Sequence, residues 1–247
     1  MIQFKYTPYP KNETLLWSPT DTEERFIDNV KKKTNIETTD FYLKNPIEYQ
    51  FNNCGFRTPD DYNSTDEGNV FLGCSYTVGI GHHLENTWSY KVNEHIGGKF
   101  WNMSIAGSGV MTHFRLLLAY HKELKIKNVF HYAPKFPRFE FYKDNTPFQY
   151  DHNYHEYMDF FLDVMAGDNT INLTFASHLL AIQNLCKIIG CNYYYIQESP
   201  PEKLKGIKAR DLIHPPISWQ QSITDMFIEK YETNNQDLDF YNTNVLL

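Results

Sequence analysis

From about residue 69 the sequence alternates between short apolar segments and longer amphipathic segments, and this alternation limits the possible fold more than any other feature. The short segments have the length and composition of buried strands. The longer ones carry apolar residues at helical spacing, as Trp88, Val92 and Ile96 do. The expected strands are 69–75, 99–107, 127–134 and 191–197, and the expected helices are 85–98, 109–125, 155–167, 172–190 and 218–232.

Strands that alternate with helices predict an α/β fold built from parallel β-α-β units with right-handed crossovers. In such sheets, ligands bind beyond the carboxyl ends of the strands. Ser75, Gly107 and Pro134 each follow an expected strand. A functional site is therefore expected at the edge of the sheet where these three residues lie.

The first 68 residues do not share the alternation. Residues 18–33 are expected to form a helix, with Ser18 as its N-cap and Asp21 closing a capping box. We interpret 1–68 as an N-terminal extension packed on the core and without a core of its own. The main domain then spans 69–235, and 236–247 form a C-terminal tail.

Composition excludes several classes of function. The formal net charge is −7, and no basic run is longer than Lys31–Lys33, which argues against a nucleic-acid partner. No apolar run reaches the length of a membrane span, and the start lacks a signal-peptide pattern. We therefore expect a cytoplasmic or virion-associated protein. The four cysteines include no C-x-x-C pair and give only weak signals for zinc or a disulfide, so we expect reduced thiols. The many Asn, Lys, Ile, Tyr and Phe residues suggest an AT-rich genome, such as that of a phage or another virus.

Ser75 is the candidate nucleophile, because it follows an expected strand where backbone N–H groups gather. A serine needs a nearby base, a group that orients the base and donors for the oxyanion. Among ten histidines, His214 differs by its D-x-x-H spacing from Asp211 and by the two prolines behind it. Two alternatives stay open: Cys74 is a rival nucleophile, and the D-x-x-H segment could be a surface loop with an Asp cap.

Three segments, "FLGCSYTVGIG", "NMSIAGSG" and "DLIHP", together with the upstream "NNCGFR", resemble the SGNH (GDSL-like) hydrolase family over about residues 50–230. The resemblance implies a three-layer α/β/α sandwich with a mainly parallel, flavodoxin-like sheet. It also implies Ser75 as nucleophile, His214 as general base and then acid, and Asp211 as the orienting carboxylate. The backbone N–H groups of Ser75 and Gly107 would donate to the oxyanion.

The sequence departs from the family pattern at two points. Cys74 stands where the first block usually has Asp, and the third block lacks its Asn after the strand 127–134. A Gly-Asp-Asn stretch at 167–169 lies between two expected helices, which is the wrong position. Arg138 and His131 are the candidates to replace the missing donor and to bind substrate.

The resemblance predicts a serine esterase that acts on an O-acetylated carbohydrate or a similar small ester. It implies no metal and no organic cofactor, and the sequence carries no signal for an oligomeric state. Two alternatives use the same fold: an inactive or weakly active module, such as a glycan-binding virion component, and an O-acyltransferase. The aromatic fraction is 16%, and the aromatic-rich insertion 136–154 would either form a wall of the site or pack over the sheet edge.

Overall fold

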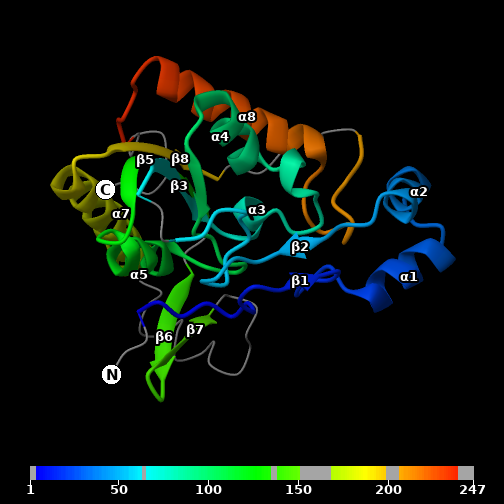
Figure 1. The fold of residues 1–247 in the computed structure, drawn as a ribbon. Coiled ribbons are helices and arrows are strands. Elements are labelled where there is room, and N and C mark those ends of the chain that lie inside the picture. Colours follow the sequence, from blue (N-terminus) through cyan, green and yellow to red (C-terminus); the bar gives the residue numbers. More distant parts are fainter. Residues whose placement is uncertain (1–3, 63–64, 135–137, 151–167, 199–205, 239–247) are drawn as a thin grey trace.

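The computed structural model describes the chain except residues 1–3, 63–64, 135–137, 151–167, 199–205 and 239–247 (Figure 1). Its centre is a four-stranded, fully parallel sheet in the order β4-β3-β5-β8. The strands are β3 (Glu67–Gly73), β4 (Lys99–Asn102), β5 (Lys125–Ala133) and β8 (Asn192–Gln197). In chain order this is 2-1-3-4, the order of the first four strands in the flavodoxin-like arrangement. The predicted α/β class is confirmed.

Helices cover both faces of this sheet, which makes the expected three layers (Figure 1). On one face α4 (Trp88–Ile96) contacts α8 (Ile217–Glu232), and on the other α5 (Val110–Tyr120) contacts α7 (Asp168–Ile189). Gly97 ends α4 as predicted, with a positive φ of 79° that glycine adopts without strain. Each face buries its own apolar cluster, so both helix layers are held by hydrophobic packing.

Two rows of side chains cross the sheet on its α4–α8 face. Amide groups link Asn69, Asn128 and Asn192, with N–O distances of 2.8 and 2.9 Å between neighbours. Further along the same strands, the ring of Phe130 stacks between Phe71 and Tyr194, at centroid distances of 5.3 and 5.0 Å. Both rows follow the strand register, so they join the same three strands side by side.

The N-terminal segment contains helices α1 (Glu23–Lys31) and α2 (Ile36–Lys44) and a two-stranded antiparallel pair, β1 (Thr14–Leu15) with β2 (Tyr49–Gln50). Several of its aromatic side chains are buried in the same cluster as β3 residues; they are Tyr9, Phe26, Tyr42, Tyr49, Phe51, Phe56 and Tyr62. The expected cap of α1 was wrong. Thr22, not Ser18, is the N-cap, and Asp21 is buried in an ion pair instead of closing a capping box.

The insertion after β5 contains a β-hairpin, β6 (Phe139–Lys143) paired with β7 (Thr146–Tyr150). Sequence reasoning did not predict strands there. The expected helix 155–167 lies outside the described residues, as does most of the expected tail 236–247. None of the helices within the described ranges combines the length and apolarity needed to cross a bilayer.

Candidate active site

Ser75 lies at a tight turn at the carboxyl end of β3. The strand ends at Gly73, Cys74 caps the next element, and Ser75 is the first residue of the short helix α3 (Ser75–Val78). A Cβ on Gly73 would collide with the side chain of Thr77, so the turn can close only with glycine at this position. Ser75 itself is half-buried. Ser75 thus lies beyond the carboxyl end of β3, next to β5. The strand order reverses between these two strands, and α/β folds bind ligands at such a point.

Cys74 does not share this exposure, since only 1% of it is accessible to solvent. Burial raises the pKa of its thiol, and the nearby charge of Arg138 opposes this only in part. A thiol must lose its proton to become a nucleophile. The geometry therefore favours Ser75 over Cys74 as the group that can meet a substrate.

Asp211 and His214 form the contact that their spacing predicts. The ring Nδ1 of His214 lies 2.7 Å from Asp211 Oδ2, and since a carboxylate only accepts, Nδ1 carries the proton. Asp211 Oδ1 accepts from the backbone N–H groups of Ile213 and His214, at 3.0 and 3.1 Å. Burial alone would raise the pKa of this carboxyl, but the hydrogen bonds and charge of His214 and the two N–H groups hold it at about 2. Asp211 is therefore an ionised, fixed acceptor, and no described residue hydrogen-bonds to Nε2 of His214, which leaves it for another partner.

The His214 loop meets the Ser75 turn at one edge of the sheet. The His214 ring packs edge-on against Tyr76, the residue after Ser75, with centroids 5.5 Å apart. His82 Nε2 donates to Pro215 O at 3.0 Å, so a second contact joins the two segments. Among the described residues no hydrogen bond links Ser75 Oγ to His214. The structure thus brings the candidate nucleophile and the candidate base into one neighbourhood without a direct hydrogen bond; in enzymes such bonds are often long until substrate is bound.

His82 stays neutral beside His214. Burial, together with the nearby charge of His214, lowers the pKa of His82 to about 3. A neutral ring can donate from Nε2 to a carbonyl, as observed, and adds no positive charge next to His214. His82 therefore supports the loop and does not compete as the base.

Gly107 lies in a turn after β4, with a positive φ of 78°. The neighbouring Ser108 donates from Oγ to Gly73 O at 3.1 Å, which ties this turn to the end of β3 two residues before Ser75. Neither the Ser75 N–H nor the Gly107 N–H bonds to another described residue. Both are thus available as oxyanion donors. Arg138, which donates to Ser108 O at 3.5 Å and whose charge acts on Cys74, lies at the same rim.

His131 is not at the rim, and its expected substrate role needs correction. It is fully buried, and both its ring nitrogens have partners: Tyr193 Oη at 2.7 Å and His113 Nδ1 at 2.8 Å. His113 Nε2 lies 2.9 Å from Ser108 Oγ, so the chain continues to Gly73. Because Gly73 O can only accept, Ser108 Oγ donates to it and accepts from His113 Nε2; with both rings neutral, His131 Nε2 donates to His113 Nδ1 and Tyr193 Oη donates to His131 Nδ1. Burial lowers their pKa values, to about 3 for His113.

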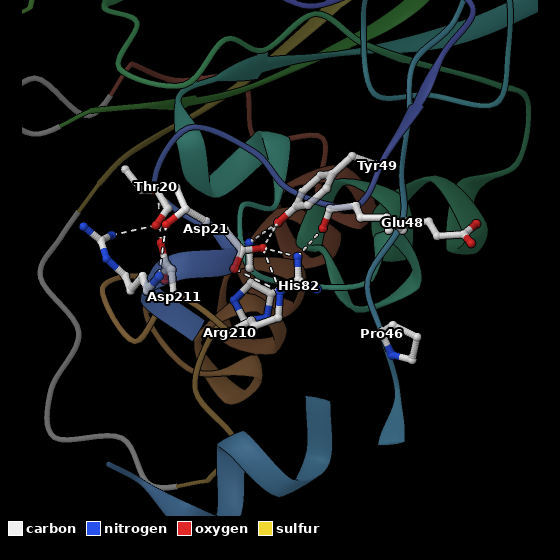
Figure 2. Close-up of polar contacts among 12 residues, drawn as sticks. Thr20, Asp21, Pro46, Glu48, Tyr49, His82, Arg210 and Asp211 are labelled. Carbon is white, nitrogen blue, oxygen red and sulfur yellow. Dashed lines mark hydrogen bonds and ion pairs between the residues drawn. The ribbon is translucent and has the colours of Figure 1, made fainter. Parts of the chain in front are cut away.

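Sequence reasoning missed the residues that hold the Asp211 loop from the N-terminal side. Asp21 forms a buried ion pair with Arg210, and Tyr49 donates to Asp21 Oδ2 at 2.5 Å (Figure 2). Thr20 Oγ1 donates to Asp211 Oδ2 at 2.9 Å. A charged pair so far apart along the chain leaves no local pattern. The only available signal was the arginine directly before Asp211.

Within the described ranges no group of three or more His, Cys, Asp or Glu side chains is arranged to hold a metal ion. A search of protein-family models with this sequence finds no match, and a search of curated proteins finds none either. The chemistry proposed for the site therefore rests on its own geometry.

Proposed function

We propose that this chain is a serine esterase of the SGNH type that forms an acyl-Ser75 intermediate. The observation that carries the proposal is the 2.7 Å contact of Asp211 with His214 Nδ1, on a loop whose imidazole packs against the residue after Ser75. An oriented histidine beside a serine at a strand-to-helix turn supports nucleophilic catalysis.

In the proposed reaction, Ser75 Oγ attacks the ester carbonyl while His214 Nε2 takes the hydroxyl proton. The Ser75 and Gly107 N–H groups bind the oxyanion. Each such donor typically contributes on the order of 100- to 1000-fold in rate. His214 then gives the proton to the departing alkoxide oxygen. Water attacks the acyl-enzyme, loses its proton to His214, and releases the acid as Ser75 regains its hydrogen.

We propose an O-acetylated carbohydrate or a similar neutral ester as substrate. Tyr76 is half-exposed beside His214 and offers an aromatic face of the kind that packs on sugar rings. Arg138 at the rim is our candidate for the donor that the third family block would supply. The net charge of −7 supports a substrate other than nucleic acid.

The test is labelling of the protein by a fluorophosphonate, read by intact mass, with acetyl-ester turnover measured in parallel. Wild type and Cys74→Ala are expected to gain one adduct, and Ser75→Ala none. Turnover should fall to background in Ser75→Ala. An unlabelled, inactive wild type would favour the alternative of a glycan-binding or structural module. An O-acyltransferase would also be labelled, but it would hydrolyse the acetyl ester slowly. Adding a sugar alcohol would speed its consumption of the ester, and the sugar alcohol would become acylated.

A further inference from the structure

Two consecutive residues of the N-terminal segment bond to two consecutive residues of the candidate catalytic loop. Asp21 pairs with Arg210, with Oδ2 2.7 Å from Nη2 and Oδ1 2.9 Å from Nε. Thr20 donates to Asp211, the carboxylate that orients His214. Figure 2 draws these contacts among Thr20, Asp21, Arg210 and Asp211. The two pairs are far apart in sequence: Thr20 and Asp211 are separated by 191 residues, and Asp21 and Arg210 by 189.

Arg210 is fixed from several directions. Besides Asp21, its guanidinium donates to Leu16 O at 2.5 Å and lies 4.0 Å from the centre of the Trp17 ring. Its backbone N–H donates to Gly81 O at 2.8 Å. The ion pair is almost fully buried, with side-chain exposures of 3% and 1%. Because Arg210 adjoins Asp211, these contacts fix the backbone from which the carboxylate projects.

The loop needs such support, because it contains no helix or strand between Gly206 and Pro216. Leu212, between Asp211 and His214, has φ +57°, in the left-handed region that a leucine rarely adopts. A residue in this region persists only where its surroundings impose it. The Asp21–Arg210 pair lies just before this strained residue and anchors the loop on that side.

We propose that Thr20, Asp21 and Arg210 are positioning residues for the Asp211–His214 pair, and that the N-terminal segment thereby completes the active site. This inference rests on the proposed function. The Thr20 hydroxyl and the His214 Nδ1–H share one oxygen, Asp211 Oδ2, so Thr20 limits how the carboxylate turns toward the ring. Among the described residues, Tyr76 packs against the His214 ring and His82 lies close enough for the charge of His214 to act on it; both come from the segment after β3.

The sharpest variant is Thr20→Val, because Thr20 is exposed and valine keeps its shape while removing the donor. Thr20→Ser restores the hydroxyl. Asp28→Asn is the matched control, since it breaks an exposed ion pair with Lys32 in the same segment, away from the loop. Each protein is compared by the downfield NMR signal of the His214 Nδ1–H in the hydrogen bond to Asp211, and by the rate of fluorophosphonate labelling across pH.

In Thr20→Val we expect the Nδ1–H signal to shift and to exchange faster with water, and labelling to slow about 3- to 10-fold, as for the loss of one hydrogen bond. Thr20→Ser and Asp28→Asn should match wild type. An unchanged Nδ1–H signal in Thr20→Val would overturn the inference. Arg210→Lys keeps the charge but loses the two-pronged contact. If folded, it should show the same change in the signal, and an unchanged signal would also count against the inference.

The two proposals fail in different ways. If wild type takes no fluorophosphonate, the esterase proposal fails. The Nδ1–H signal still decides whether Thr20 positions the pair, because it requires no reaction. A purely structural role would lower the thermal midpoint of Thr20→Val and leave both the signal and the pH profile of labelling unchanged.

Discussion

Replacing Asp21 with Asn should destabilise the protein far more than a typical surface change. The substitution keeps the size of the side chain but removes the charge that neutralises Arg210, whose side chain is only 3% exposed. Leaving one partner of a buried pair uncompensated costs roughly 3–5 kcal/mol. The Asn oxygen can still accept from Tyr49 or from one nitrogen of Arg210, so we expect the lower end, about 3 kcal/mol. Domains are typically stable by about 5–15 kcal/mol, so this loss is large.

The assay is urea unfolding at pH 7, with the free energy of unfolding taken from linear extrapolation. Asp28→Asn is again the control, because the Lys32 and Asp28 side chains are 67% and 52% exposed. Such surface pairs contribute about 0.3–0.5 kcal/mol, and that contribution should disappear in about 1 M salt. The Asp21 effect should survive the salt, since solvent ions do not reach the pair. A loss below about 1 kcal/mol in Asp21→Asn would refute the view that this ion pair holds the N-terminal segment to the loop.

Two further outcomes follow from the buried groups. The folded-state pKa of Asp211 is about 2, below its ordinary value, so its contacts stabilise the fold above about pH 4 and are lost as the pH falls toward 2. Between about pH 4 and pH 2, the free energy of unfolding should fall by about 2 kcal/mol less in Asp211→Asn than in wild type. Equal slopes of unfolding free energy against pH in the two proteins would contradict the low pKa of Asp211. Tyr193→Phe should cost about 1–3 kcal/mol of unfolding free energy, because His131 Nδ1 then loses its buried donor. An unaltered urea midpoint would mean that the Tyr193–His131–His113–Ser108 chain does not stabilise the fold.

Much of the sheet could be predicted from the sequence, because its strands are buried on both faces and therefore appear as short continuous apolar runs. The segment around Val129 and Phe130 is an example: β5 (Lys125–Ala133) begins two residues before the predicted strand 127–134 and ends one residue short of its end. Ser75 and the Asp211–His214 contact were also within reach. The turn follows a strand directly, and the contact spans only three residues.

The remaining site residues depended on long-range contacts or on the direction of a side chain. The Ser18 and Asp21 spacing fits a capping box locally, but a buried arginine from the far end of the chain takes the Asp21 carboxylate. His131 lies near the end of its strand, which suggested the rim. Strand side chains alternate between faces, however, and His131 points into the layer with His113 and Tyr193. That alternation is present in the sequence, but which face is enclosed depends on how the helices pack.

The amide row Asn69–Asn128–Asn192 has a consequence at the opposite end of the strands. If β5 slid by two residues against β3, side chains would keep their faces, but the amide link would break, because Asn69 would oppose Phe130 in one direction and Asn128 would oppose Phe71 in the other. Such a slip would carry Gly73 about 7 Å away from its present neighbours, and Ser75 with it. The asparagines thus fix the strand register, and through it the position of Ser75, the proposed nucleophile, just beyond the far end of β3.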